Sequence, residues 1–165
     1  MVDSEPGRGA TFRIYLPQVP AAVAPPPGLY RPSMPRGFET ILLVEDDPAL
    51  REMAAALLGR LGYTVLMAAD GIEAMNLAHV KDRHPIDLLV TDAGNPHISG
   101  KELSGRIQRL YPRALALFTS VYLERSIVRH GVLNEGVAVL RKPFTPSSLA
   151  MKVREILDRE IGITP

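Results

Sequence analysis

Asp92 is the residue whose type and position most invite a chemical explanation. It follows the apolar stretch PIDLLV (85–90) within the segment VTDAGNPHISG (90–100), and Gly, Asn, Pro, Ser and Gly residues come after it. The apolar stretch is typical of a buried strand, and the residues after Asp92 are typical of a loop. A carboxylate at the carboxyl end of a buried strand is either a turn former or part of a site.

Polar residues also end three other predicted strands. They are Glu45, Asp46 and Asp47 after residues 40–44, Thr119 and Ser120 at the end of residues 114–119, and Lys142 just after residues 137–140. In a parallel sheet these strand ends lie at one edge, where such folds place their sites. Carboxylates ~4 Å apart repel by ~4 kcal/mol at an effective dielectric constant of ~20, so the cluster requires a cation or protonation.

The residue types of this cluster suit one kind of chemistry. Oxygen ligands without His or Cys favour magnesium. The ammonium of Lys142 and a hydroxyl could bind phosphoryl oxygens, while one carboxylate acts as the nucleophile. Each residue also has a purely structural interpretation, and Asp47 before Pro48 is well placed to cap a helix. Polar groups at four strand ends together favour a site for handling a phosphoryl group.

The elements that must position this cluster alternate between strands and helices. The predicted strands are residues 40–44, 64–68, 86–91, 114–119 and 137–140, and the predicted helices are residues 48–62, 71–80, 100–111, 122–132 and 145–160. Apolar strands alternating with amphipathic helices predict an α/β fold, with a parallel sheet covered by helices on both faces. Gly62 is expected to stop the first helix, and Thr145 and Pro146 to begin the last one.

The composition narrows the class of protein. Of the 165 residues, 46% are hydrophobic and 22% are charged, and the net charge of +1 gives no electrostatic reason to expect nucleic acid as a partner. The absence of cysteine excludes disulfides and Cys-based zinc sites. No apolar stretch reaches the ~20 residues of a membrane helix, and the N-terminus lacks signal-peptide features. We therefore expect a cytoplasmic protein without direct membrane contact.

Residues 39–160 resemble a response-regulator receiver domain, the phosphoacceptor module of two-component signalling. The segments that carry the resemblance are ILLVEDD, DLLVTDAGNPHISGKEL, LFTS and LRKPF, at the spacing of the family. The resemblance implies a doubly wound, flavodoxin-like, five-stranded parallel sheet in the order 2-1-3-4-5. It also implies a histidine kinase or histidine phosphotransfer protein as partner.

The same resemblance implies a role for each residue of the cluster. Asp92 would accept the phosphoryl group from a phosphohistidine, Ser120 would bond a phosphoryl oxygen, and Lys142 would pair with the acyl phosphate. Magnesium would be bound by Asp46, Asp92 and the Gly94 carbonyl, with Glu45 acting through water. The Lys142–Pro143 peptide bond would be cis.

The chain departs from the family pattern at several positions. Asn95 stands where an apolar residue is common, Val121 where Gly or Ala is usual, and Val139 where Tyr or Phe is common. The missing aromatic puts the usual conformational switch in doubt. Gly94 and Tyr122 occupy positions that tune attack by water on the acyl phosphate, and neither supplies the polar group of fast receivers, so we expect slow autodephosphorylation.

The N-terminal segment carries a second resemblance. Residues 3–17, DSEPGRGATFRIYLP, resemble the last glycine-rich turn and strand of the ATP-binding domain of a sensor histidine kinase. We therefore interpret residues 1–17 as a remnant of that domain, residues 18–38 as a Pro-rich linker, and residues 39–160 as a receiver from a hybrid histidine kinase. Kinase catalytic motifs are otherwise absent, so this chain is expected to act as a phosphoacceptor. Phe12, Ile14 and Leu16 would share one face of a strand with open edges, which makes a homodimer through this segment possible.

Three alternatives remain beside the phosphoacceptor. An aspartate-nucleophile phosphatase has a similar sheet, but it places its nucleophile on the first strand in a D-x-D pattern, which VEDDP lacks. A flavin-binding module would need a phosphate loop after the first strand, where the acidic residues would repel phosphate. A phosphorylation-independent interaction module would be expected to lack Asp92 or Lys142.

Overall fold

The structure is a computed structural model that describes residues 2–5, 7, 9–15, 34–80, 85–94, 98–121 and 137–160. Contacts divide the chain into two compact units, residues 1–32 and residues 33–165. The second unit starts six residues before residue 39, where we expected the domain to begin. Met34 packs against the core, and the Gly37 N–H donates a hydrogen bond to the Leu61 carbonyl (3.1 Å).

The second unit is built on a five-stranded parallel sheet. Its strands are β3 (Thr40–Val44), β4 (Thr64–Ala68), β5 (Leu88–Asp92), β6 (Leu115–Ser120) and β7 (Ala138–Arg141). They lie in the order β4-β3-β5-β6-β7, with all neighbouring pairs parallel. Counted from the first strand of the sheet, this is the predicted order 2-1-3-4-5, and the doubly wound fold is confirmed.

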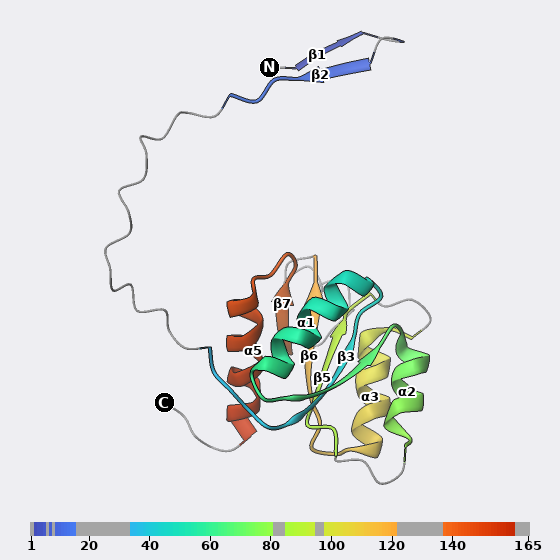
Figure 1. Ribbon diagram of the computed structural model, residues 1–165. Helices are drawn as coiled ribbons and strands as arrows, with labels where there is room; N and C mark the ends of the chain where they lie inside the picture. Colours follow the sequence, from blue (N-terminus) through green and yellow to red (C-terminus); the bar gives the residue numbers. More distant parts are fainter. Residues whose placement is uncertain are drawn as a thin grey trace, which may run out of the picture. The chain divides into compact units, whose positions relative to one another are not determined.

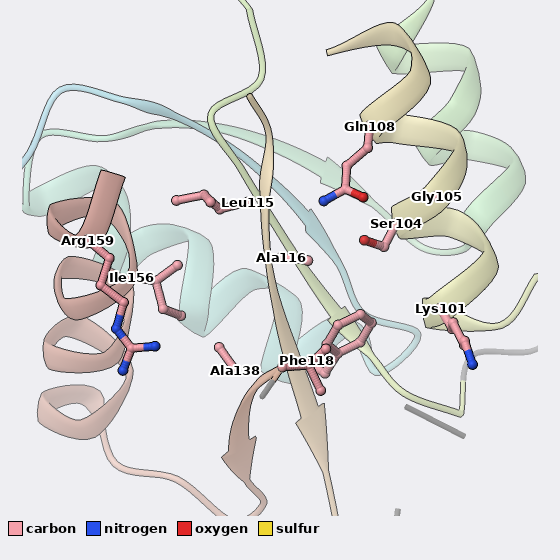
Figure 2. Close-up of a pocket in the computed structure, with 11 residues that line it drawn as sticks. Lys101, Ser104, Gly105, Gln108, Leu115, Ala116, Phe118, Ala138, Ile156 and Arg159 are labelled. Carbon is pink, nitrogen blue, oxygen red and sulfur yellow. The ribbon is translucent and has the colours of Figure 1, made fainter. Parts of the chain in front are cut away.

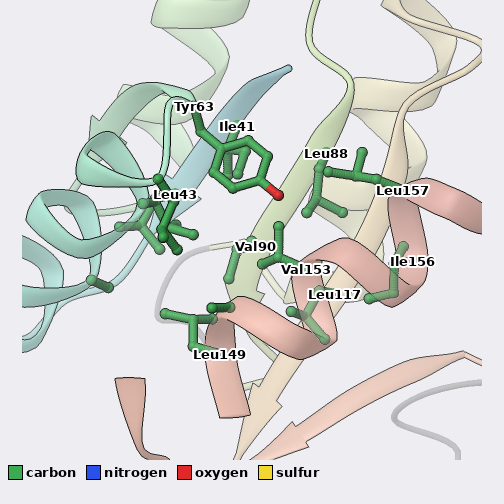
Figure 3. Packing of buried hydrophobic residues seen from close by; sticks show 14 residues of the cluster. Ile41, Leu43, Tyr63, Leu88, Val90, Leu117, Leu149, Val153, Ile156 and Leu157 are labelled. Atoms are coloured by element: carbon green, nitrogen blue, oxygen red, sulfur yellow. The ribbon is translucent and has the colours of Figure 1, made fainter. Parts of the chain in front are cut away.

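Helices cover both faces of the sheet (Figure 1). Helices α1 (Pro48–Arg60) and α5 (Pro146–Glu160) pack on one face, and α2 (Gly71–Ala78) and α3 (Gly100–Leu110) pack on the other. The face under α1 and α5 is filled by a cluster that includes Leu43, Val90, Leu117 and Leu149 (Figure 3). The helix predicted over residues 122–132 lies outside the described residues.

Pairing between strands shifts both ends of three predicted strands by one or two residues. The predicted strand 86–91 spans 88–92, the predicted strand 114–119 spans 115–120, and the predicted strand 137–140 spans 138–141. The ladder sets these ends, because Asp92 pairs with Thr119 and Ser120 pairs with Arg141. Asp92 and Ser120 are therefore the last residues of their strands and are held by the sheet.

Helix ends follow the capping chemistry of the sequence. Asp47 is the N-cap of α1, where its Oδ1 accepts hydrogen bonds from the Ala49 and Leu50 N–H groups (2.8 and 3.1 Å). Helix α1 ends at Arg60, two residues earlier than predicted, because Gly62 has a φ of 103°, which favours glycine. The predicted helices 71–80 and 100–111 end at residues 78 and 110. Helix α5 begins at Pro146, and Thr145 Oγ1 accepts a hydrogen bond from the Ser148 N–H (3.1 Å).

The first unit contains a short antiparallel hairpin. Strand β1 (Val2–Glu5) pairs with β2 (Gly9–Phe12), with Val2 opposite Phe12. The strand expected over Phe12, Ile14 and Leu16 is shorter in the structure, because β2 ends at Phe12 and residues 13–15 belong to no strand. Leu16 lies outside the described residues.

None of the helices in the described part of the chain combines the length and the apolar character needed to cross a membrane.

Candidate functional site

The ammonium of Lys142 joins two carboxylates at the carboxyl end of the sheet. Its Nζ donates hydrogen bonds to Asp92 Oδ2 (2.8 Å) and to both oxygens of Glu45 (3.0 and 2.7 Å). The three side chains are only 15%, 26% and 5% exposed for Lys142, Asp92 and Glu45. Residues 97 and 50 positions apart in the chain therefore form one ionic cluster.

Backbone hydrogen bonds between strands hold this cluster in register. The Lys142 N–H donates to the Ser120 carbonyl (2.7 Å), and the Ala93 N–H donates to the Thr119 carbonyl (3.0 Å). These bonds place the ends of β5, β6 and β7 side by side, so Ser120 is a backbone neighbour of Lys142. The Lys142–Pro143 peptide bond is cis, as the family resemblance implied.

The three acidic residues after β3 have different surroundings. Glu45 is buried beneath Lys142, whereas Asp46 and Asp47 are exposed. Asp46 Oδ1 accepts a hydrogen bond from the Asp47 N–H (3.1 Å), and Asp47 caps α1. The predicted helix-capping role of Asp47 is confirmed, and Asp46 is the exposed carboxylate that caps no helix.

Arg51 is a contributor to this region that the sequence analysis missed. From the first turn of α1, its Nη1 donates hydrogen bonds to the Glu45 carbonyl (2.5 Å) and to the Asp46 carbonyl (3.4 Å). The guanidinium thereby fixes the backbone of the acidic loop and brings a second positive charge. The sequence could have indicated this role, because Arg51 stands four residues after Asp47, in the first turn of the helix predicted to follow the acidic loop.

Burial and ion pairing act in opposite directions on the charged groups. Burial disfavours the charge on Lys142, but the hydrogen bonds to Asp92 and Glu45 outweigh it and raise the pKa of Lys142. Burial raises the pKa of Glu45, and the hydrogen bond from Lys142 offsets only part of that rise. Lys142 therefore stays charged at neutral pH, which keeps a cation beside Asp92.

Gly94 lies directly against the carboxylate of Asp92. Its N–H donates a hydrogen bond to Asp92 Oδ1 (2.8 Å), and a Cβ added at this position would stand 3.6 Å from the same oxygen. Gly100 at the start of α3 has less room, because an added Cβ would be 2.5 Å from the Asp92 carbonyl. A glycine at position 100 thus allows α3 to begin directly against the end of β5.

The donor groups at this edge fit a magnesium ion. Glu45, Asp46 and Asp47 follow β3 and Asp92 ends β5, while Lys142 pairs with Glu45 and Asp92 and Arg51 binds backbone carbonyls. Four carboxylates against two cations leave net negative charge for a divalent cation. Within the described ranges, no three His, Asp or Glu side chains are grouped so that they alone could hold a metal. The expected set needs only two carboxylates and a backbone carbonyl, and magnesium ordinarily takes one or two carboxylates and keeps several waters.

The aromatic side chain that position 139 lacks has a counterpart on the neighbouring strand. Phe118 pairs directly with Val139 across β6 and β7, is 3% exposed, and forms a small cluster with Ala93. This neighbour could not be predicted from the sequence, because the pairing of two strands cannot be deduced from either strand alone. Val121, just after Ser120, is 62% exposed, and Tyr122 lies outside the described residues.

A larger groove lies away from this cluster. It has a volume of about 480 Å³ and is bordered by α3, β6 and α5, with Lys101 and Arg159 on opposite sides (Figure 2). Its lining includes none of the acidic residues, Ser120 or Lys142. Val137, the first described residue after positions 122–136, borders it.

Comparisons with known proteins agree with this fold. The family model described as response regulator receiver domain matches residues 41–154. The sensor kinase CckA of Brucella abortus is 32% identical over 167 residues, covering 96% of this chain and 18% of that protein. The sensor histidine kinase RcsC of Salmonella typhimurium is 39% identical over 70 residues, covering 42% of this chain and 7% of that protein. The chain thus spans less than a fifth of the length of either relative.

Solved structures with the same fold include a receiver domain of a hybrid histidine kinase. The receiver domain of the hybrid histidine kinase CckA has a TM-score of 0.59 and 37% identity, covering 72% of this chain and 98% of that chain. The chemotaxis protein CheY4 of Vibrio cholerae has a TM-score of 0.63 at 24% identity, covering 73% of this chain and 99% of that chain. The CheY4 likeness bears on the fold alone.

Proposed function

This chain belongs to the response regulator receiver domain family, and on that premise we propose that Asp92 is the residue that accepts its phosphoryl group. Phosphoacceptor function in two-component signalling follows from the family and from the hybrid-kinase relatives. The observation that carries the choice of residue is the contact between Asp92 and Lys142 at 2.8 Å. Asp92 also ends its strand and remains partly exposed, so a donor can reach it.

The residues around Asp92 suit transfer from a phosphohistidine. A carboxylate oxygen of Asp92 attacks phosphorus, the nitrogen–phosphorus bond breaks, and the imidazole leaves with the electron pair of that bond. Lys142 stands beside the carboxylate and counters the charge of the acyl phosphate. Lys142 contacts Asp92 Oδ2, and the Gly94 N–H donates a hydrogen bond to Asp92 Oδ1, which fixes the orientation of the carboxylate. Ser120, beside Lys142, is proposed to bond a phosphoryl oxygen once Asp92 is modified.

Receiver domains generally bind magnesium for phosphorylation. In this chain we assign the ion to Asp46, Asp92 and the Gly94 carbonyl, with Glu45 acting through water. When bound, it would neutralise charge on the phosphoryl oxygens. The burial of Glu45 supports an indirect role for this carboxylate, because its side chain is only 5% exposed and both of its oxygens face the Lys142 ammonium.

We further propose that the chain is a part of a hybrid histidine kinase that includes its receiver domain. The match to sensor kinase CckA covers 96% of the chain, and residues 39–160 alone are too few to account for that coverage. The similarity therefore extends into the N-terminal segment, where the β1–β2 hairpin lies. The proposed partners are a histidine kinase or a histidine phosphotransfer protein, the class with which hybrid-kinase receivers interact.

The test uses the full chain with magnesium and acetyl phosphate, followed by intact-mass measurement. Wild type should gain one phosphoryl group, and Asp92→Asn should gain none. Asp47→Asn is the matched control, because it also removes a carboxylate from this edge while Asn caps a helix as well as Asp does. If Asp92→Asn still gains the mass, the assigned residue is wrong. Continuous hydrolysis of a phosphomonoester such as p-nitrophenyl phosphate would instead favour the phosphatase alternative, because a phosphoacceptor also releases phosphate from acetyl phosphate as its own acyl phosphate decays.

A further inference from the structure

Thr119 carries a buried hydroxyl on the opposite side of β6 from Ser120. The residue is 2% exposed, and its Oγ1 has no hydrogen-bond partner among the described residues. Leaving a buried hydroxyl unpaired costs ~1–3 kcal/mol. Successive side chains of a strand point to opposite faces, so Thr119 faces α1 and α5.

A small cavity lies beside this hydroxyl and reaches Glu45. It has a volume of about 10 Å³, and both Thr119 and Glu45 line it. The rest of its wall is largely apolar and includes Leu43, Val90 and Leu149, which Figure 3 labels. This volume is at the lower limit for one water molecule, and a buried water needs at least two polar partners. Among the residues that line it, Thr119 and Glu45 are the two with polar side chains.

We propose that Thr119 is a positioning residue for phosphoryl transfer, which holds Glu45 through one water molecule in this cavity. Each oxygen of Glu45 accepts a hydrogen bond from Lys142 and keeps a lone pair for a second donor. The water donates to Glu45 and is held in turn by Thr119. Glu45 then fixes Lys142, and Lys142 fixes Asp92. This role rests on the proposed function of Asp92.

Burial and connectivity favour this role over an incidental hydroxyl. Thr119 pairs with Asp92 in the sheet, and its carbonyl accepts the hydrogen bond of the Ala93 N–H. The hydroxyl is thus fixed to the strand end that carries the phosphoacceptor. A valine would place a methyl group where the hydroxyl stands, so the substitution Thr119→Val removes the oxygen with little change in side-chain volume.

The test compares Thr119→Val and Thr119→Ser with wild type. Thr119→Val should unfold in urea at nearly the same concentration as wild type, because it creates no space and removes only one hydrogen bond, that to the proposed water. Its phosphorylation by acetyl phosphate with magnesium should nevertheless be slower by ~10-fold, the lower end for lost supporting contacts at metal sites. Thr119→Ser, which keeps the oxygen, should restore most of the rate.

The outcomes separate this inference from the proposed function. Wild-type rates for Thr119→Val, or a Thr119→Ser rate no better than that of Thr119→Val, would overturn the role of Thr119 alone. A wild type that gains no phosphoryl group would overturn the function of Asp92 and this role together. A high-resolution crystal structure should show a water within hydrogen-bonding distance of Thr119 Oγ1 and Glu45 in wild type, and its absence there would also overturn the inference.

Discussion

Replacing Lys142 by Met tests whether one ammonium compensates the charge at the end of the sheet. Met keeps an unbranched side chain of similar length and removes only the charge and its hydrogen bonds. We expect a loss of stability at neutral pH, because Glu45 would remain buried at 5% side-chain exposure without its cation.

The contact distances give the size of this effect. Lys142 Nζ lies 2.7 Å from Glu45 Oε2 and 2.8 Å from Asp92 Oδ2. The distance between these two carboxylate oxygens is therefore at most the sum of the two contact distances. At an effective dielectric constant of ~20, such a pair repels by ~3 kcal/mol. Removing one partner of a buried ion pair costs ~3–5 kcal/mol. Because Asp92 is 26% exposed, we expect the lower end, a loss of about 3 kcal/mol in the free energy of unfolding.

The loss should depend on pH in a defined direction. Burial already raises the pKa of Glu45, and removal of Lys142 takes away the contact that offsets this rise. A carboxyl group whose folded pKa exceeds its unfolded pKa stabilises the fold below the unfolded pKa, and that contribution is lost as the pH rises through the folded pKa. The deficit of Lys142→Met should therefore be largest at neutral pH. It should shrink as the pH falls toward the ordinary Glu value of 4.5.

Urea unfolding of wild type and Lys142→Met across pH measures this deficit. Lys101→Met is the matched control, because Lys101 is an exposed lysine on α3. Added magnesium should restore part of the stability of Lys142→Met, since a second cation can take over the compensation. A loss no greater than that of Lys101→Met, or one that persists unchanged at acidic pH, would refute the reasoning.

Four other substitutions test three separate parts of the domain. Asp47→Ala should lower the free energy of unfolding by ~1 kcal/mol, because it removes the α1 cap. It should weaken magnesium binding less than Asp46→Ala does. Equal losses of affinity in a magnesium titration would mean that the assignment of the acidic loop is shifted by one residue. Glu39→Gln should cost ~1.5–3 kcal/mol at neutral pH, because a carboxylate oxygen of Glu39 lies 2.8 Å from the Arg154 guanidinium. Burial opposes the charge on Glu39, but its hydrogen bonds, first that from Arg154, outweigh burial and hold the pKa of Glu39 below 4.5. The stability advantage of wild type over Glu39→Gln should therefore be present above pH 4.5 and lost as the pH falls through the lowered pKa. A difference in acid unfolding that does not depend on pH would contradict this pairing. Gly94→Asn should speed the loss of the phosphoryl group by up to ~10²-fold, because its side chain would begin 3.6 Å from Asp92 Oδ1 and could orient water; an unchanged decay in timed intact-mass measurements would argue against this view of the pocket.

The sequence alone determined the elements and the edge at which the polar residues meet. The apolar period of strands and helices is a local property, and capping residues such as Asp47 and Thr145 act within one turn of their own position. The positions of Asp92, Ser120 and Lys142 at strand ends could therefore be predicted without contacts. The sheet order and the cis Lys142–Pro143 bond were expected only through resemblance to a family.

The tertiary structure decided which of these side chains touch and how each is surrounded. That Lys142 contacts Glu45 and Asp92 together depends on strands from distant parts of the chain, joined in one register. The opposite surroundings of Glu45 and Asp46, the pairing of Phe118 with Val139, and the cavity beside Thr119 are likewise invisible in the sequence. The physical reason is that periodicity and capping arise from neighbours along the chain, whereas burial, pKa shifts and ion pairs arise from neighbours in space, which only the packed sheet brings together.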